Sequence, residues 1–220
     1  MALTIRKNHT PAQTQVLGGL ARLRASFPLE ERLQQSSPPI RTAYAQLLRS
    51  WLQAMPLAAA TLDAEVLETL EALDAVVTEE HGLGCYPFSS TDTGIHVGLP
   101  DGTVNAMCAI DALAIARLAR VRTPINATCT SCGNCIALQV EENGGLDHDQ
   151  VELASVVWHH AVATHTSCSQ GLCRHIRFLC RACPEPENAE HLTLPQAAAI
   201  GNMFFRFQSA LLAAHAGQTA

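Results

Sequence analysis

The sequence predicts an α+β protein, with an N-terminal helical, winged-helix-like module followed by a mixed or antiparallel β-sheet core that has flanking helices. Three observations support this prediction. Apolar residues recur at helical spacing through most of residues 12–73, short β-type runs separated by turns begin near residue 84, and an apolar helical stretch begins at residue 194. We therefore place the first module at residues 1–83 and the sheet-containing core at residues 84–220.

The N-terminal module is expected to contain three helices. Residues 12–60 carry two helical patterns, and the break between them falls at the Ser-Ser-Pro-Pro sequence of residues 36–39. A third helix is expected to begin with Thr61, whose hydroxyl is suited to capping, and to run through Leu73. A short apolar run then leads into a turn that ends at Gly82.

This order of helices, short strand and glycine-bearing turn is typical of a winged helix-turn-helix, which leaves two interpretations. The module could bind DNA, or it could pack against the rest of the chain as scaffold. The candidate recognition segment, residues 64–73, has no arginine, and the whole chain has a formal net charge of −6. Because phosphate contacts dominate nucleic-acid binding, these features favour the scaffold, and we expect no nucleic-acid partner.

The core is expected to alternate short strands with buried helices. Apolar and β-branched residues between turns predict strands at residues 86–89, 94–99, 136–140 and, as a strand or a short helix, 151–163. Asp101-Gly102 is a typical hairpin turn. Residues 104–120 are apolar nearly all round, which predicts a buried helix, and a closing helix is expected from residue 194 to about residue 214.

The nine cysteines are the first functional signal. Residues 1–10 carry charge but no apolar segment of a signal peptide, and no stretch approaches the roughly 20 apolar residues that span a bilayer. We therefore expect a cytoplasmic protein without a membrane partner, whose thiols are reduced. In that compartment cysteines indicate metal binding or thiol chemistry rather than disulfides, and an odd count leaves at least one thiol unpaired.

Cys108 and Asp111 form the first candidate site. They are three residues apart in the helix expected at residues 104–120, so their side chains share one face. In the first turn of that helix, the dipole would favour a Cys108 thiolate, and burial would raise the pKa of Asp111 toward neutrality. A soft nucleophile beside a proton donor is a functional pair. The alternative is a structural cysteine beside a core aspartate with its own partner.

Cys173 forms the second candidate site. Its neighbours Arg174 and His175 would provide an electropositive environment and lower the pKa of the thiol. The following residues are expected to continue as a strand into the core. Cys168 is the nearest rival for the same role.

The third cluster contains two overlapping C-x-x-C spacings, formed by Cys129, Cys132 and Cys135. Together with Cys180 and Cys183, a further C-x-x-C pair, they could provide a structural zinc site with four thiolates. The alternatives are that these cysteines are independent of one another, or that they act as soft relay ligands.

Several of these segments resemble the alkylmercury (organomercurial) lyases. Residues 105–118, which contain Met-Cys-Ala-Ile-Asp-Ala-Leu at residues 107–113, resemble the catalytic segment of that family. Cys129 and the glycine and strand that follow it look like another family segment, and residues 172–178 are similar to the second catalytic segment. Residues 197–205 match the closing helix, and the order of segments agrees from about residue 84 to residue 212.

The resemblance implies a protonolysis. Cys108 and Cys173 would capture the soft mercury of a small organomercurial as thiolates, and Asp111 would supply the proton to the departing carbon. The products would be a hydrocarbon and Hg(II) held by two sulfurs, with cellular thiols or a mercuric reductase as the acceptor. External thiols but no cofactor would be required, and Cys129 would be structural. Met107 departs from the family, which usually has an aromatic residue there.

The surplus cysteines leave two other functions open. Residues 132, 135, 168, 180 and 183 exceed what the lyase family needs, and Arg174 stands where some members carry a second cysteine. One alternative is a thiolate metal-binding protein or winged-helix metalloregulator. The other is a lyase homologue that acts on a different thiophilic substrate. The sequence does not predict an oligomeric state.

Overall fold

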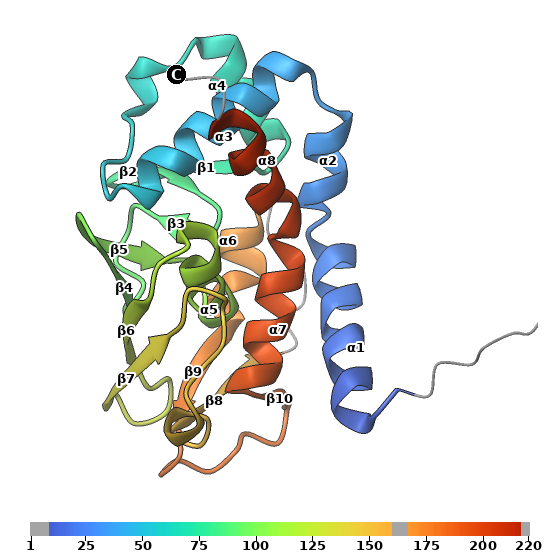
Figure 1. Cartoon of the computed structure of the whole chain (residues 1–220), viewed down its shortest axis with the longest axis vertical. Coiled ribbons are helices and arrows are strands. Elements are labelled where there is room, and N and C mark those ends of the chain that lie inside the picture. The colour runs from blue at the N-terminus through green and yellow to red at the C-terminus, as the bar shows by residue number, and fades with distance from the viewer. Residues whose placement is uncertain (1–8, 160–166, 217–220) are drawn as a thin grey trace, which may run out of the picture.

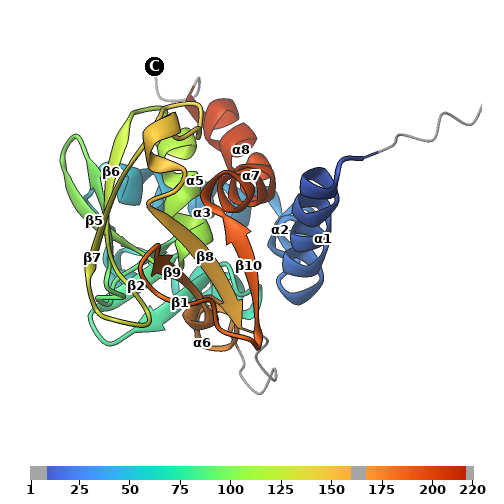
Figure 2. The same ribbon diagram turned by 90° about the horizontal axis from the view of Figure 1, so that it is seen from below.

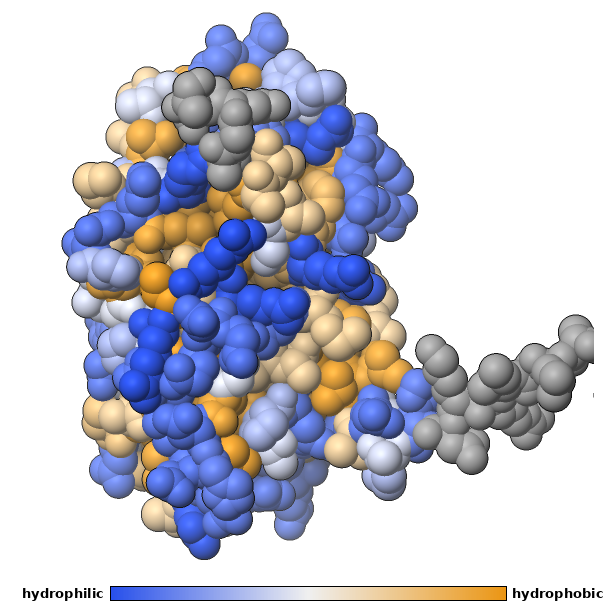
Figure 3. All heavy atoms as spheres, viewed as in Figure 1, coloured by the Kyte–Doolittle hydropathy of each residue, from blue (hydrophilic) through white to orange (hydrophobic). Residues whose placement is uncertain are grey.

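The computed structural model describes residues 9–159 and 167–216 of the chain (Figure 1). The described part contains a seven-stranded sheet, a three-stranded sheet and the helices that pack against them, which confirms the α+β class. None of the described helices is long and apolar enough to span a bilayer. On the face seen in Figure 3, apolar areas are interspersed with hydrophilic ones, as is usual for a folded domain.

Two helices were predicted for residues 12–60. The structure forms three helices there: α1 (Pro11–Ser26), α2 (Leu29–Gln35) and α3 (Pro38–Leu52). The break predicted at residues 36–39 is confirmed, and Pro38 occupies the first turn of α3, where its missing N–H costs nothing. An additional break follows Ser26, because a residue that precedes a proline, here Phe27, disfavours the helical conformation.

The third predicted helix begins later than expected. Thr61 ends a short 3₁₀ helix, η1 (Ala59–Thr61), and does not cap α4 (Ala64–Ala72). The cap is Asp63, whose carboxylate accepts a hydrogen bond from the Glu65 N–H at 2.9 Å. Aspartate and threonine are both good capping residues, and the sequence alone did not choose between them.

The large sheet has the strand order β1-β2-β3-β5-β4-β6-β7, and all its neighbouring strands are antiparallel. Its strands, in chain order, are β1 (Val76–Glu79), β2 (Gly82–Cys85), β3 (Phe88–Ser89), β4 (Ile95–Leu99), β5 (Gly102–Ala106), β6 (Thr123–Thr128) and β7 (Cys135–Val140). The hairpin at Asp101-Gly102 is confirmed, whereas β6 was not predicted. The boundary expected between residues 83 and 84 falls inside β2. The division into domains and the winged-helix assignment stay predictions.

The small sheet has the order β10-β8-β9 and contains β8 (Ala154–His159), β9 (Ile176–Cys180) and β10 (Ala189–Thr193). The stretch expected at residues 151–163 to be a strand or a short helix is a strand over β8, and residues 160–163 lie outside the described part. Between β8 and β9 the chain forms α6 (Cys168–Gly171) and the 3₁₀ helix η3 (Cys173–His175).

The central helix, α5 (Ala109–Ala119), lies between the large sheet and α7 (Leu194–Phe204), with α1 outside α7 (Figure 2). The helix predicted at residues 104–120 therefore starts five residues late. Residues 104–106 are instead the end of β5, because Val104 and Asn105 pair with β4 and Ala106 pairs with β3. An apolar run fits either structure, and the hairpin partner decides between them.

The closing helix predicted to run from residue 194 to about residue 214 is divided at Phe205 into α7 and α8 (Arg206–Ala216). The division allows both Phe204 and Phe205 to be buried. The two rings contact edge to face at 5.0 Å, and the Phe204 ring also stacks on that of Phe27 at 5.9 Å between centroids.

The contact between α5 and α7 depends on Gly201. A Cβ atom at this position would lie 2.6 Å from the backbone oxygen of Ile110 and 3.1 Å from the Ala114 Cβ. We expect Gly201→Ala to lower the free energy of unfolding by about 1–3 kcal/mol, because α7 must move away from α5. Urea denaturation measures the change.

Gly18→Ala is the matched control, since Gly18 lies on an exposed part of α1 and an added Cβ would meet nothing within 4 Å. Alanine favours the helix, so this variant should be unchanged or more stable by about 0.5–1 kcal/mol. If Gly201→Ala were as stable as Gly18→Ala, close packing of the two helices would not be important.

Candidate active site

Cys108, Asp111 and Cys173 come together in the interior, and we call them the buried thiol–carboxyl set. Their two sulfur atoms and a carboxylate oxygen all lie within 4.8 Å of one another. None of the three residues is more than 5% exposed. The geometry therefore places two soft ligands and one proton-carrying group close enough to act on the same atom.

Cys108 and Asp111 are positioned by the start of α5. Cys108 is the N-cap of the helix, with an extended backbone, and not part of its first turn as predicted. The Cys108 Sγ atom accepts a hydrogen bond from the Asp111 N–H at 3.4 Å, in the way that a capping oxygen usually does. The two side chains still share one side of the helix, because a cap and the third helical residue are neighbours in space.

Cys173 reaches the set from η3, immediately before β9. Its Sγ atom donates a hydrogen bond to the Asp111 Oδ2 atom at 3.7 Å. The Cys168 sulfur lies 3.5 Å from the Cys173 sulfur and is also buried, so it forms a third thiol beside the set. Cys173, and not its rival Cys168, donates this hydrogen bond to the carboxyl group.

Burial raises the pKa of Asp111 to about 7, although hydrogen bonds from Cys108 and Cys173 lower it in part. The same burial raises the pKa of Cys108, together with its hydrogen bond to Cys173 and the nearby Asp111 charge. For Cys173, the hydrogen bond from Cys108 lowers the pKa. Its contact with Cys168, its burial and the Asp111 charge outweigh that effect, and the pKa is raised.

The predicted thiolates at Cys108 and Cys173 are thus wrong for the resting protein, in which both thiols stay protonated. Helix-dipole stabilisation of Cys108 is outweighed by loss of water and by the neighbouring carboxyl group. Arg174 is exposed at the surface while Cys173 is buried. The electropositive environment inferred from sequence neighbours therefore does not lower the pKa of Cys173.

Two residues that sequence reasoning missed hold α6 in place. The Asp74 Oδ2 atom accepts from the Cys168 N–H at 2.9 Å, and the Tyr86 hydroxyl accepts from the Ser169 N–H at 2.8 Å. The Tyr86 hydroxyl in turn donates to the Asp74 Oδ1 atom at 3.2 Å. A carboxylate at the C-terminal end of a helix is disfavoured by the dipole, so Asp74 after α4 could have signalled a partner elsewhere.

A surface pocket of about 310 Å³ lies next to the buried set. Its lining includes Met107, Ser169 and Arg174, which are sequence neighbours of Cys108, Cys168 and Cys173. Met107 is the residue that departs from the family pattern.

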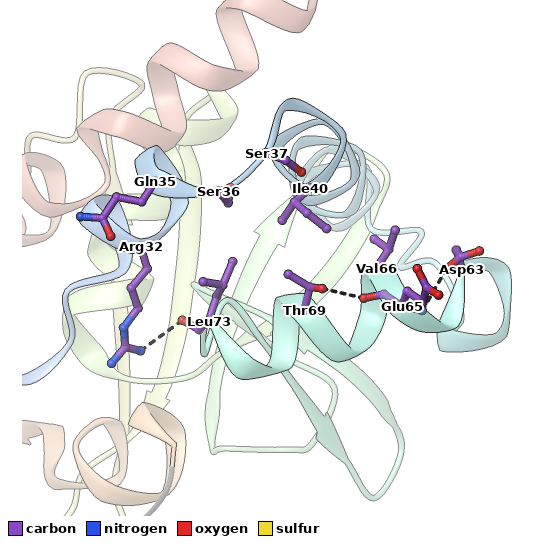
Figure 4. Close-up of a pocket in the computed structure, with 10 residues that line it drawn as sticks. All are labelled: Arg32, Gln35, Ser36, Ser37, Ile40, Asp63, Glu65, Val66, Thr69 and Leu73. Atoms are coloured by element: carbon purple, nitrogen blue, oxygen red, sulfur yellow. Dashed lines mark hydrogen bonds between the residues drawn. The ribbon is translucent and has the colours of Figure 1, made fainter.

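A larger pocket, of about 700 Å³, lies elsewhere, between α2, α3 and α4 (Figure 4). It contains no cysteine, and its side chains include Asp63, Glu65 and Thr69. Arg32, which lines it, donates to the Leu73 carbonyl at 3.1 Å and lies 3.9 Å from Asp74. Size alone would select this pocket, but it has no group suited to thiol chemistry.

The remaining candidates form a separate group of four thiols, and we call Cys129, Cys132, Cys180 and Cys183 the four-cysteine cluster. Cys135, which was also considered for a metal site, is exposed at the start of β7 and is not part of it. Of the two overlapping C-x-x-C spacings, only Cys129-x-x-Cys132 therefore contributes both of its cysteines to the cluster. Cys85 is buried and belongs to neither group.

Cys129 accepts hydrogen bonds from several backbone N–H groups of the cluster. Burial raises the pKa of Cys129, but N–H groups of Cys180, Cys132 and Ser131 outweigh burial and lower the pKa to about 6. A thiolate stabilised by hydrogen bonds in this way is suited to binding a cation.

Comparison with known proteins decides the family. A family model described as MerB, alkylmercury lyase, matches residues 88–205, which is more than half of the chain and includes the buried set. The chain belongs to the alkylmercury lyase family. The resemblance inferred from the motifs is confirmed, and this lyase is an enzyme for organomercurial substrates.

A solved structure described as the mercury-bound form of MerB2 is similar to this lyase, with a TM-score of 0.61 and 18% sequence identity. The match covers 89% of this chain and 99% of that chain, so the two share a fold. No curated protein matches the sequence.

The raised pKa of Asp111 predicts a pH-dependent stability. The pKa is near 3.9 in the unfolded chain and about 7 in the folded protein. The group's favourable contribution is therefore complete below about pH 4 and is lost as the pH rises through about 7. Asp111→Asn has no such titration. Relative to wild type, its unfolding free energy should rise between pH 4 and 8 by an amount on the order of a few kcal/mol.

Urea denaturation of both proteins at several pH values provides the comparison, because titrations common to both cancel in the difference. Asp149, which is exposed, provides the control variant Asp149→Asn. A difference between wild type and Asp111→Asn that does not change with pH would mean that Asp111 titrates as an exposed carboxylate.

Proposed function

We propose that this lyase cleaves carbon–mercury bonds with Cys108 and Cys173 as the mercury ligands and Asp111 as the proton donor. The observation that carries the proposal is the convergence of two thiol sulfurs and one carboxyl oxygen within 4.8 Å in the interior. Sulfur is the soft ligand that a soft metal prefers. The similar structure described as mercury-bound supports the assignment of mercury to this fold.

The first step exchanges one thiol for another. An organomercurial in a cell arrives as R–Hg–SR′, bound to a small thiol. When Cys108 or Cys173 takes its place, a new S–Hg bond forms, the old one breaks, and the cysteine proton leaves with R′S⁻ as R′SH. The resting thiols are protonated, so each S–Hg bond that forms must release one proton.

The second step uses the proton of the remaining thiol. As its sulfur binds mercury, this thiol passes its proton to Asp111, and the Cys173 S–H already points at the Asp111 Oδ2 atom. Asp111 then gives the proton to the carbon as the C–Hg bond breaks, and the bonding pair goes to the new C–H bond. The sum is R–Hg–SR′ + 2 Cys-SH → R–H + Hg(S-Cys)₂ + R′SH, with no net oxidation.

The environment of Asp111 suits both halves of this transfer. A carboxyl group with a pKa of about 7 can accept a proton and give it back near neutral pH, which is the condition for efficient acid–base catalysis. Burial also keeps water away from the mercury and the carboxyl group, which strengthens the interactions between them.

We place Cys168 beside this chemistry as a third thiol. It contacts the Cys173 sulfur, and its N–H is held by Asp74, so it supports the position of Cys173 and is available to the departing Hg(II). The acceptor of Hg(II) would be a cellular thiol or a mercuric reductase. We expect this sequence of events in the cytoplasm, as part of resistance to organic mercury.

A turnover assay with phenylmercury in excess glutathione tests the assignments. Wild type should release benzene, measured by gas chromatography. Cys108→Ala and Cys173→Ala should fall to background, and Asp111→Asn should lose about 10²- to 10⁴-fold, as expected for a general acid. Cys168→Ala, which removes a supporting thiol, should slow turnover by no more than about 100-fold.

Cys135→Ser is the control, because Cys135 is an exposed thiol outside both groups, and it should match wild type. Release of benzene by Cys108→Ala or Cys173→Ala at the wild-type rate would contradict the ligand assignment. No release from phenylmercury or methylmercury by wild type would point to another thiophilic substrate.

A further inference from the structure

The four-cysteine cluster is separate from the buried thiol–carboxyl set. Its four sulfur atoms all lie within 4.8 Å of one another. Three of the sulfur–sulfur distances are 3.5 Å for Cys180–Cys183, 3.6 Å for Cys132–Cys180 and 3.8 Å for Cys129–Cys183. The four thiols are contributed by two C-x-x-C pairs about fifty residues apart, one in each sheet's neighbourhood.

Each C-x-x-C pair is held in a turn. In the turn between β6 and β7, the Gly133 N–H donates to the Cys129 carbonyl at 3.0 Å, and Gly133 has φ +75°, a conformation that favours glycine. After β9, the Cys183 N–H donates to the Cys180 carbonyl at 3.1 Å. Both pairs thus point two sulfurs to the same side of a short loop, as zinc-binding C-x-x-C turns do.

Backbone hydrogen bonds join the two turns. The Cys180 N–H donates to the Cys129 Sγ atom at 3.3 Å, and the Thr130 N–H donates to the Phe178 carbonyl at 2.9 Å. An N–H group directed at a sulfur stabilises the thiolate form that a metal requires.

The distances fit a metal better than they fit disulfides. A tetrahedron with zinc–sulfur bonds of about 2.3 Å has sulfur–sulfur edges of about 3.8 Å. The observed 3.5, 3.6 and 3.8 Å lie at or just below that edge. A disulfide would require about 2.05 Å.

The loop between β6 and β7 has no apolar side chain of its own besides the cysteines. Residues 130–135 are all exposed. Without a metal, the exposed and half-buried thiols of the cluster would be open to oxidation. A metal ion would add to the hydrogen bonds that hold the turn, because its binding free energy becomes folding free energy.

We propose that Cys129, Cys132, Cys180 and Cys183 bind one structural zinc ion, which ties the β6–β7 turn of the large sheet to the end of β9 in the small sheet. The thiols that still carry a proton release it to solvent when zinc binds, and no electron is transferred. A closed set of four sulfurs leaves no position for substrate, which makes the site structural rather than catalytic.

The proposed zinc site lies at the end of the strand that follows Cys173. β9 begins three residues after Cys173 and ends at Cys180, so the zinc ion would anchor the far end of that strand. Zinc is favoured over iron because it forms a four-thiolate site without redox chemistry that oxygen and mercury would disturb. The inference does not depend on the roles proposed for the buried set.

Elemental analysis of protein purified without metal-affinity chromatography tests the proposal. Wild type should contain about one zinc ion per chain, as a closed four-thiolate site requires. Cys132→Ser and Cys183→Ser should lose most of it. Cys135→Ser is a matched control, because Cys135 is an exposed thiol in the same turn as Cys132, and it should retain full zinc. Cys108→Ala should also retain zinc, whether or not it cleaves mercury compounds.

Two further measurements keep the test independent of folding defects in the variants. Zinc X-ray absorption of wild type should give four sulfur neighbours at about 2.3 Å. Removal of zinc by a chelator should lower the melting temperature, and added zinc should restore it. Protein free of metal, protein that contains iron in place of zinc, or zinc retained by both Cys132→Ser and Cys183→Ser would overturn the proposal.

Discussion

The structure depends on the burial of one carboxyl group, Asp111, against the sulfurs of Cys108 and Cys173. An isolated buried carboxylate is costly, and here its pKa is raised to about 7, so it can accept and release a proton near neutral pH. The same burial raises the pKa of the Cys108 thiol, and the contact with Cys168 together with burial raises that of Cys173. Loss of water and contact between the thiols thus prepare the three groups for a reaction in which mercury replaces the thiol protons.

The fold supplies this burial through α5. This helix is enclosed by the large sheet on one side and by α7 on the other, and Gly201 allows the closest approach. Its N-terminal end therefore lies deep in the core, with Cys108 as the cap. The segment after β8 brings Cys173 to that end, and Asp74 and Tyr86 hold the short helix before it. The interior position of the site is a consequence of where α5 begins.

Part of this could be predicted from sequence. Cys108 and Asp111 were identified by their spacing, which survives the shift of Cys108 from first turn to cap, and by the lyase-like motif around them. The start of α5 was placed wrongly because an apolar run fits both a helix and a buried strand until its strand partner is known. The pKa of Cys173 was misjudged in part from its neighbour Arg174, which is exposed, and Asp74 was missed because its hydrogen bond from the Cys168 N–H spans 94 residues. Long-range packing decides such features, and the local sequence pattern contains no information about that packing.

The most direct test of the roles of Cys108, Asp111 and Cys173 is a crystal structure of this lyase after a single turnover of an arylmercury compound. We expect one Hg(II) ion bonded to the Cys108 and Cys173 sulfurs, with the Asp111 carboxyl group beside it and no organic group left on the metal. Mercury bound only at the four-cysteine cluster, with the buried set free of it, would contradict these roles.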